Sequence, residues 1–316
     1  MKSTSKPYGI VVSTDNIARQ EWLSYRRTGI GGSDAGSVIG MNQYKSRYSL
    51  WADKMGMLPE VEDNERMRLG RDLEQYVAER WSEKTGKRFR RRNYMFRSHR
   101  WPWMLADVDR EVVGENAGLE CKTTTIKPEG IDDGNVPERF YCQCLHYMAV
   151  MGYERMYLAI LVFGAGLYEF TIERDEAQIQ ALANAEGAFW TKYVDAQTPP
   201  DVDGTDSTYD ALAAIFPEST QREVELFNVQ ELLELDIIKD QIKELTARKQ
   251  EIENSIKVTM GDAARALAPG YTVSWPSYSK TDIDRGLLKE KYPEVYAECT
   301  KSSTYRRFTV KKEDAS

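Results

Sequence analysis

Two strand-like runs near the middle of the chain constrain its fold more than any other feature. They are WPWMLADVDREVV and GLECKTTTI. The segment between them, 114–118, has the length and the glycines of a hairpin connection. Because side chains alternate between the two faces of a strand, Leu119 and Cys121 point one way while Glu120 and Lys122 point the other. The sequence therefore predicts a strand pair that presents a carboxylate and an amine on one face.

Asp109 completes a chemically coherent set with these two residues. It precedes Glu120 across the predicted hairpin, so the two carboxylates can come within range of one cation. Carboxylates suit Mg²⁺, which prefers oxygen ligands, and Lys122 can orient or deprotonate a water or stabilise developing charge. The apolar residues around the hairpin indicate a buried pair, where charged groups need partners or a metal. An ordinary surface Glu/Lys pair is the alternative interpretation.

A further acid, Asp107, lies two residues before Asp109. On a strand both would face the same side. Asp107 could add a metal ligand or only a hydrogen bond, and the sequence leaves that choice open.

The distribution of charge also bears on function. The net charge of −7 argues mildly against a protein that simply coats nucleic acid. However, residues 84–100 carry eight basic side chains just before the carboxylate cluster, where they could face phosphates. They are Lys84, Lys87, Arg88, Arg90, Arg91, Arg92, Arg97 and Arg100. A solvated surface is the alternative.

The cysteines and the chain start indicate the compartment. We expect a soluble, cytoplasmic protein without disulfides, because no apolar run approaches membrane-span length and the start lacks the apolar region of a signal peptide. Cys142, Cys144 and His146 are spaced two apart in a predicted helix, where such positions point away from each other, so we interpret them as buried residues rather than a zinc site.

Helical patterns surround the predicted strands. The apolar spacing predicts helices at 15–27, 64–85, 137–151 and 175–195, and Glu74 lies on the flank of the second. Runs on either side of Gly164–Gly166 predict a second hairpin. Ahead of the 64–85 helix, a glycine-rich turn precedes Ser33 or Asp34, either of which could cap the next helix and leave its N–H groups for an anion.

The 316 residues exceed the usual size of one domain. We expect a core at 1–196, a linker at 197–221 that is rich in Asp, Thr, Ser and Pro, and a C-terminal region at 222–316. That region begins with a long helix whose apolar stripe follows a 3,4 spacing, and it ends in a basic, strand-like tail. We expect the stripe to pack within the chain, with a partner or oligomer interface as the alternative.

Four motifs in order resemble a known family. They are GIGGSDAGSVIGMNQYKSRYSLW, GRDLE, MLADVD followed by GLECKT, and YCQCLHYMAVMG. This order is similar to that of the YqaJ-type viral recombinases, which resemble the phage lambda exonuclease group of PD-(D/E)xK nucleases. The resemblance covers roughly residues 20 to 175. It implies an α/β (α+β) core with a mixed central sheet flanked by helices, to which the long-helix region is appended.

The resemblance also implies roles for individual residues. Asp109, Glu120 and the backbone carbonyl of Cys121 would hold metal, with Glu74 as the helix acid at the same site. Lys122 would be the catalytic lysine, and Gln143 would position water or substrate. Arg27 and Ser33 resemble the pocket that holds a terminal 5′ phosphate. The cofactor would be Mg²⁺, or Mn²⁺, as two ions. Many relatives carry Asn where this chain has Asp107.

The function implied by the resemblance is alkaline exonuclease activity on linear double-stranded DNA, 5′ to 3′. Such an enzyme works with a single-strand annealing protein in phage-type recombination and would form a homo-trimer. An endonuclease, a nuclease with an iron–sulfur cluster and a catalytically silent DNA-binding or partner-recruiting module are the alternatives. The position of the cysteines argues against the cluster, and the presence of Asp109, Glu120 and Lys122 together argues against the silent module.

Overall fold

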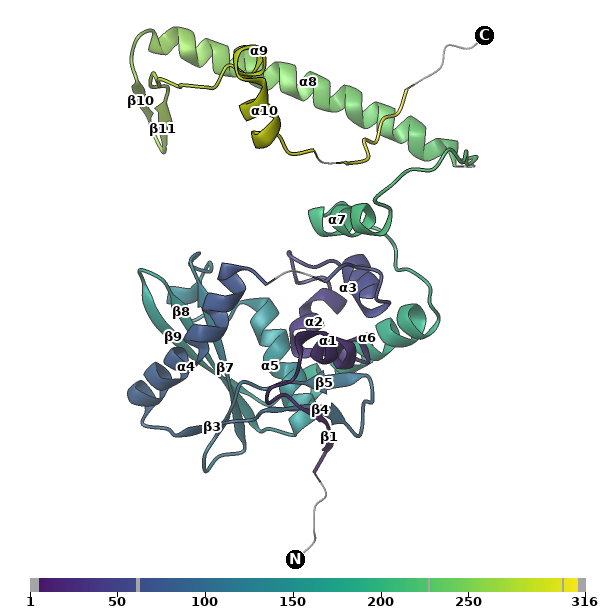
Figure 1. The fold of residues 1–316 in the computed structure, drawn as a ribbon. Coiled ribbons are helices and arrows are strands. Elements are labelled where there is room, and N and C mark those ends of the chain that lie inside the picture. The colour runs from purple at the N-terminus through teal and green to yellow at the C-terminus, as the bar shows by residue number, and fades with distance from the viewer. Residues whose placement is uncertain (1–5, 61–62, 227, 303, 312–316) are drawn as a thin grey trace, which may run out of the picture. The chain divides into compact units, whose positions relative to one another are not determined.

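The computed structural model describes residues 6–60, 63–226, 228–302 and 304–311 (Figure 1). The chain forms two compact units, Met1–Phe216 and Pro217–Ser316, and each is described by itself.

Two mixed sheets form the first unit together with the helices around them. In its described part, one sheet has the order β1-β4-β5-β2 and the other the order β3-β6-β7-β8-β9. The strands of the first are β1 (Tyr8–Ser13), β4 (Tyr94–Ser98), β5 (Met104–Ala106) and β2 (Ile30–Gly31). Those of the second are β3 (Phe89–Arg91), β6 (Arg110–Val112), β7 (Ala117–Thr124), β8 (Arg155–Val162) and β9 (Gly166–Glu173). The pairs β2–β5 and β7–β8 are parallel, so both sheets are mixed as expected.

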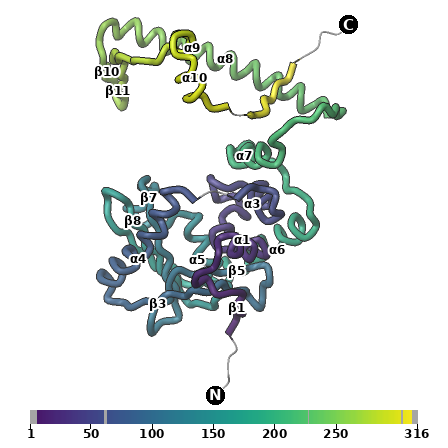
Figure 2. Tube along the Cα trace, viewed as in Figure 1, coloured from purple at the N-terminus to yellow at the C-terminus, as the bar shows by residue number. Residues whose placement is uncertain are grey.

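Helices cover both faces of the second sheet, as the traces in Figures 1 and 2 show. On one face α4 (Glu65–Thr85) buries Val77, Ala78 and Trp81 against Leu119 and Cys121 of β7. On the other face α5 (Glu138–Met151) packs on β8 and the first sheet. The predicted alternation of β7 is confirmed, because Glu120 faces Gln143 of α5.

The ends of α4 follow from its sequence. The Asn64 side chain accepts a hydrogen bond from the Met67 N–H, and Gly86 ends the helix with a φ of 72°. Gly86 suits this position because a residue without Cβ adopts the left-handed conformation at little cost. The predictions of this helix and of the 137–151 helix are confirmed.

The first strand-like run does not form one strand, contrary to expectation. Residues 104–106 join the first sheet as β5, which pairs with β4 and β2, whereas 110–112 join the second sheet as β6. The chain crosses between the sheets at 107–109. Asp107 and Asp109 therefore lie at the junction of two sheets rather than on a single strand.

The remaining helices of the first unit surround this junction. They are α1 (Arg19–Arg27), α2 (Gly32–Val38), α3 (Arg47–Lys54), α6 (Glu176–Phe189) and α7 (Asp206–Ile215). A 3₁₀ turn (Ile131–Asp133) precedes α5, and a π-helical turn (Trp190–Asp195) extends α6. Gly31 is the N-cap of α2, so Ser33 and Asp34 lie inside the helix instead of capping it; the Asp34 side chain accepts from the Gly31 N–H at 3.2 Å.

The segment 197–221, expected to be a linker, contains α7. Thr208 and Ala211 of this helix are buried, and the Thr208 hydroxyl donates to Ser46 Oγ at 2.8 Å. Small and apolar residues at helical spacing give α7 one face that packs on α3. The composition of the segment alone did not reveal this face. The first compact unit consequently continues to Phe216.

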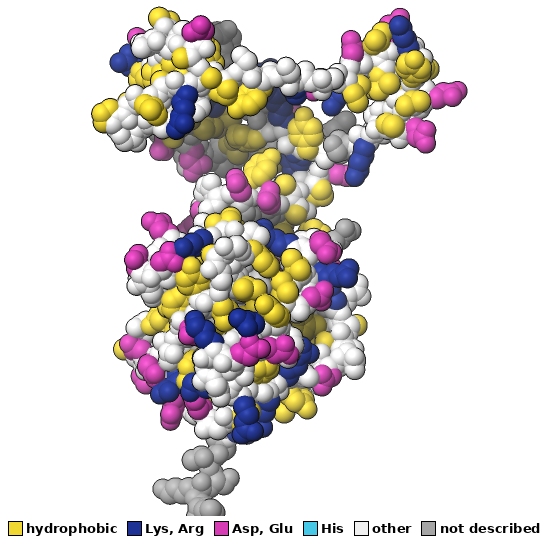
Figure 3. All heavy atoms as spheres, turned by 90° about the vertical axis from the view of Figure 1, so that its left-hand side faces the viewer, with side chains coloured by type: hydrophobic (Ala, Val, Ile, Leu, Met, Phe, Trp, Pro, Cys, Tyr) yellow, Lys and Arg dark blue, Asp and Glu magenta, His cyan; other side chains and the backbone are white. Residues whose placement is uncertain are grey.

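The second unit is built on a 32-residue helix, α8 (Val229–Met260). A two-stranded sheet of β10 (Arg265–Ala268) and β11 (Tyr271–Ser274) and the short helices α9 (Arg285–Lys291) and α10 (Pro293–Cys299) follow it. Within this unit the apolar stripe of α8 includes exposed side chains, with Ile242 at 58 % and Leu245 at 70 %. The space-filling view shows hydrophobic side chains on the surface of this unit (Figure 3).

The basic tail also differs from expectation. Residues 304–311 form no strand, and Lys312 lies outside the described residues. A strand needs backbone hydrogen bonds to a neighbouring strand along its edge, and residues 304–311 join no sheet of the described part of the chain. None of the described helices has both the length and the apolar character that a membrane span requires.

Candidate active site

A pocket of about 580 Å³ opens where the two sheets meet. It is lined by residues from α1, α2, α4, α5, β7 and the 107–109 crossing. Among them are Trp22, Arg26, Ser33, Arg71, Glu74, Arg91, Arg92, Asp107, Asp109, Glu120, Lys122, Gln143 and Tyr147. We call it the carboxylate pocket. Its lining includes every side chain to which the family resemblance assigned a role, except that of Arg27.

Glu120 lies at the centre of the pocket and is 1 % exposed. Its Oε1 accepts from Gln143 Nε2 at 2.7 Å and lies 2.5 Å from Lys122 Nζ. Its Oε2 is buried with no hydrogen-bond partner. Burial raises the pKa of this carboxyl, and the nearby Lys122 only partly opposes that rise. A buried carboxylate oxygen without a partner is costly, so this atom is a natural place for a cation.

Asp109 is held by the backbone of β7. Its Oδ2 accepts from the Cys121 N–H at 2.9 Å. The β6–β7 ladder ends at the pair Arg110–Leu119. The Cys121 N–H, which comes next on that edge of β7, therefore has no strand partner and bonds to Asp109 instead. Burial and then the negative charges of Glu120 and Glu74 raise the pKa of Asp109 well above its usual value.

Lys122 is the cation of this cluster. The charges of Glu120 and Asp109 outweigh burial and raise its pKa, so the amine remains protonated at neutral pH. Its ammonium also lies 5.4 Å from the centroid of the Phe140 ring. A protonated lysine suits orientation of the substrate and stabilisation of developing charge.

Gln143 and Tyr147 hold the cluster from α5. Gln143 Nε2 donates to Glu120 and also to the Tyr147 hydroxyl at 3.1 Å, and that hydroxyl donates to the Asp107 carbonyl at 2.9 Å. Gly32 makes this contact possible, because a Cβ there would lie 2.5 Å from Tyr147 Cε1. The sequence predicted Gln143 but not Tyr147, whose spacing of four residues from Gln143 on one helix was the available signal.

Glu74 reaches the pocket but is not directed at the other carboxylates. Its Oε1 accepts from the guanidinium of Arg110, which is 2 % exposed and also donates to Gln75 Oε1 at 3.2 Å. In the described part of the chain, no three His, Cys, Asp or Glu side chains are grouped closely enough to hold a metal. Asp109 and Glu120 are the acids that could hold a first cation, and Arg110 occupies one oxygen of Glu74.

Asp107 has an identified partner. Its Oδ2 accepts from the Trp22 indole N–H at 3.1 Å. Burial raises its pKa, while this hydrogen bond and Arg26 oppose the rise. This contact joins α1 to the crossing segment and so favours a structural hydrogen bond among the two roles left open for Asp107.

Arg26, rather than Arg27, lies beside Ser33. Arg26 donates to Ser33 Oγ at 2.9 Å and stacks over Trp22 at 5.0 Å. On α1 successive side chains diverge by 100°, so only one of two neighbouring arginines can face the pocket. The resemblance pointed to Arg27, whereas the structure places its neighbour Arg26 at the pocket.

Three arginines border the opposite wall of the carboxylate pocket. Arg91 and Arg92 come from the basic segment 84–100, and Arg71 comes from α4. Arg71 also pairs with Asp63, and Arg92 with Glu111. Lys87 and Arg97 of the same basic segment do not line the pocket, so only part of the predicted basic run is placed beside the carboxylates.

Comparison with known proteins identifies the family. The family model described as the YqaJ-like viral recombinase domain matches residues 21–154. The uncharacterized protein YqaJ of Bacillus subtilis (strain 168) is 35 % identical over 315 residues, which span 98 % of this chain and 99 % of that protein. This chain belongs to the YqaJ family. The resemblance inferred from the order of the four motifs is thereby confirmed.

Solved structures similar to this YqaJ-family chain are more distant. The alkaline exonuclease LHK-Exo from Laribacter hongkongensis has a TM-score of 0.46 at 18 % identity, over 56 % of this chain and 93 % of that one. A phage-related exonuclease from Haemophilus somnus 129PT has a TM-score of 0.43 at 10 % identity, over 56 % of this chain and 100 % of that one. Likenesses at this level carry no functional argument.

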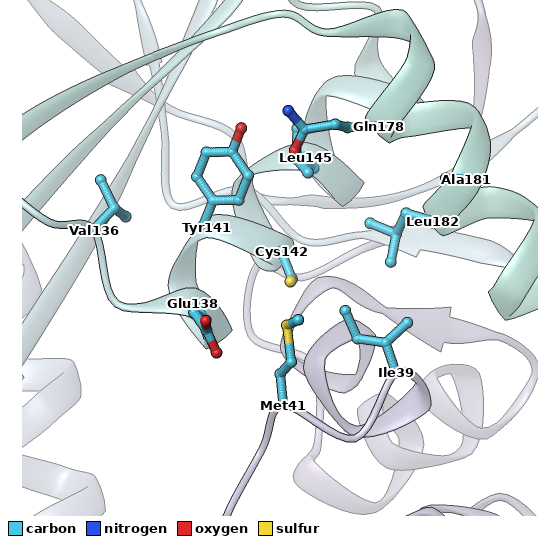
Figure 4. Close-up of a pocket in the computed structure, with 10 residues that line it drawn as sticks. All are labelled: Ile39, Met41, Val136, Glu138, Tyr141, Cys142, Leu145, Gln178, Ala181 and Leu182. Carbon is cyan, nitrogen blue, oxygen red and sulfur yellow. The ribbon is translucent and has the colours of Figure 1, made fainter.

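The YqaJ-family unit also contains an apolar pocket of about 450 Å³. Figure 4 shows Ile39 and Met41 facing Cys142 and Leu182 across it. Burial raises the pKa of the Cys142 thiol to about 11. A thiol in that state is a poor nucleophile at neutral pH, and the apolar walls offer little to a phosphodiester. The carboxylate pocket is the better candidate for chemistry.

Proposed function

We propose that this YqaJ-family chain is a metal-dependent DNA exonuclease that hydrolyses phosphodiester bonds at the ends of linear double-stranded DNA, from 5′ to 3′. The observation that carries the proposal is the cluster of Asp109, Glu120 and Lys122, in which Glu120 Oε2 is buried without a partner. Two carboxylates and one lysine at a pocket bordered by arginines suit hydrolysis of a phosphodiester.

The donor set fits Mg²⁺ or Mn²⁺. Asp109, Glu120 and the Cys121 carbonyl offer the oxygen ligands that these ions prefer, and the carbonyl belongs to the same edge of β7 as the N–H that meets Asp109. A second ion would take Glu74 once Arg110 is released. When bound, such ions neutralise phosphate charge and lower the pKa of water.

The protein's own groups would position the substrate. Lys122, protonated at neutral pH, would bind an oxygen of the scissile phosphate and stabilise the charge that develops there. Gln143 is fixed by its bonds to Glu120 and Tyr147, so its amide oxygen would accept a hydrogen bond from the attacking water and orient it. Arg26 and Ser33 would hold a terminal phosphate, in place of the Arg27 and Ser33 pair that the resemblance suggested.

Partners follow from the family and from the second unit. We infer phage-type recombination together with a single-strand annealing protein, because the family is one of viral recombinases. The exposed stripe of α8 supports self-association, and a homo-trimer is the form proposed. Size-exclusion chromatography with light scattering tests it: a particle of three chains is expected, and monomer alone at micromolar concentration would exclude it.

The activity is tested by digesting a linear duplex labelled at either the 5′ or the 3′ end, with Mg²⁺ or with EDTA. A covalently closed circle and the Glu120→Ala variant serve as controls. We expect metal-dependent release of nucleotides from the 5′ ends of linear DNA only, and loss of roughly 10³-fold or more in the variant.

Other outcomes assign the site differently. Cutting of the closed circle would indicate an endonuclease. Release from the 3′ end first would reverse the polarity. Absence of cleavage with every divalent metal would mean that Asp109, Glu120 and Lys122 belong to a binding module, and the proposed function would fail.

A further inference from the structure

A second groove adjoins the carboxylate pocket beside the loop that follows α2. Its volume is about 660 Å³. It shares Ser33, Lys122 and Gln143 with the carboxylate pocket. Because the two hollows share these side chains, a ligand whose phosphate lies at Lys122 can extend directly into the second groove.

The second groove combines charged and large uncharged side chains. Arg66, Glu129 and Arg139 are on its wall, and three large uncharged side chains there are exposed to solvent. Tyr44 is 64 % exposed, Ile126 68 % and Met41 47 %. Single exposed apolar residues are common on protein surfaces, but these three line one groove that opens beside the carboxylates.

Tyr44 belongs to a stack of planar groups. The Arg139 guanidinium lies 4.9 Å from the centroid of the Tyr44 ring and 4.5 Å from that of Phe140. Phe140 in turn contacts the ammonium of Lys122. Aromatic rings and guanidinium planes are the surfaces on which unpaired nucleobases stack, and here they adjoin the lysine that would meet the phosphate.

We propose that the second groove is a nucleobase subsite, which takes an unstacked base of a nucleotide flanking the scissile phosphate onto the Tyr44 ring. The inference rests on the proposed nuclease function and deepens it. The groove volume is within the range of small-molecule sites. Stacking accepts any base, because every base has a π-face, so the subsite would not read sequence.

The subsite has a consequence for substrate choice. A base can reach Tyr44 only after it leaves its pair, and unpairing is easiest at an end of the duplex. Binding through Tyr44 would therefore favour frayed ends over internal positions. A groove that binds only phosphate, through Arg66 and Arg139 on its wall, would show no such dependence on the base.

A double-mutant cycle tests the subsite with the full chain. The DNA is a labelled duplex in which one strand ends in an overhang of two unpaired nucleotides. Duplexes with the overhang on either strand are prepared. In each, the overhang carries either a natural base or an abasic residue. Binding is measured by fluorescence anisotropy in Ca²⁺. The wild-type chain should bind the abasic DNA roughly tenfold more weakly. Tyr44→Ala should bind both DNAs alike, and Tyr44→Trp should keep the preference.

Tyr209→Ala is the matched control, because Tyr209 on α7 is exposed to 66 % and lines none of the hollows described above. It should keep the full preference for a natural base. Equal wild-type binding of both DNAs on both strands, or an undiminished preference in Tyr44→Ala, would overturn the subsite.

Cleavage of the same DNAs in Mg²⁺ separates this inference from the proposed function. If the wild-type chain cleaves DNA but Tyr44→Ala and Tyr209→Ala prefer a natural base over an abasic residue to the same extent, the subsite is refuted and the nuclease proposal stands. If no DNA is cleaved, the nuclease proposal fails, and the binding cycle in Ca²⁺ still decides whether Tyr44 stacks on a base.

Discussion

Two buried acidic clusters lie close together in the first unit and differ in how their charge is balanced. Asp34 is 2 % exposed and is met by Lys54 at 2.7 Å, Lys45 at 3.3 Å and Arg26 at 3.4 Å. Burial alone would raise its pKa, but the three cations lower it well below its usual value. Around Asp109 and Glu120, Lys122 is the cation in direct contact, and burial raises the pKa of both acids.

The difference separates a cluster whose charge is balanced by cations from one whose charge is not. The charge of Asp34 is neutralised by side chains from α1, α3 and the loop between α2 and α3, so nothing further is required for it to remain ionised. The carboxylates of the pocket lack an equivalent set of cations, and one oxygen of Glu120 has no partner. Perturbed acids of the second kind are typical of catalytic sites.

The largest expected effect is on the Asp34 cluster. Asp34→Ala should lower the free energy of unfolding by about 3–5 kcal/mol, because it leaves the buried Lys54 ammonium without its partner. Urea denaturation measures the change. Asp53→Ala is the control, since Asp53 is 31 % exposed and pairs with Lys45; it should cost below about 1 kcal/mol. Equal losses in the two variants would contradict a special role for Asp34.

A smaller effect, on activity rather than stability, is expected at Lys122. Lys122→Ala should reduce nuclease turnover by about 10²–10³-fold, because it removes the charge that meets the phosphate. Lys127→Ala, the loss of an exposed lysine that pairs with Asp132, should leave turnover unchanged. The rate of nucleotide release from linear duplex measures both. Full activity of Lys122→Ala would mean that Lys122 neutralises the charge of Glu120 and Asp109 and has no role in turnover.

The smallest expected effect is a change in the free energy of unfolding that depends on whether metal is present. In EDTA, Asp109→Asn should raise the free energy of unfolding by roughly 1 kcal/mol, because it removes one of two buried, mutually repelling carboxylates. The same variant should lose most of the stabilisation that Mg²⁺ gives the wild-type chain. Thermal unfolding in EDTA and in Mg²⁺ measures both changes. Destabilisation in EDTA would show that this cluster, like that of Asp34, is balanced without metal.

The sequence predicted those features that depend on local pattern. The alternation along β7 placed Glu120 and Lys122 on the face opposite Leu119, and the apolar spacing placed a helix at 64–85, close to the bounds of α4. These follow from short-range rules of strand pleating and helix periodicity. The family resemblance, rather than the pattern, directed attention to Glu74 and Gln143.

The features that sequence missed depend on distant partners. The break at 107–109 arises because β5 finds β4 and β2, and the pairing of Glu74 with Arg110 joins residues 36 positions apart. The choice of Arg26 over Arg27 depends on how α1 docks against α2, and the burial of α7 depends on α3. A local pattern can give a helix an apolar face, as in α7, but it does not specify which distant residues that face meets.

The pairing of β2 with β5 also determines when the site can form during folding. Ile30 meets Met104 in that pair, and the α5 residue Tyr147 closes against Gly32. The β6–β7 hairpin is local and closes quickly, whereas contacts between residues far apart in sequence carry a large loop-closure entropy and form slowly. During synthesis the carboxylates emerge before α5 does. A nascent chain would therefore carry its acids without the pocket, and the carboxylate pocket would be complete only when the first unit has folded.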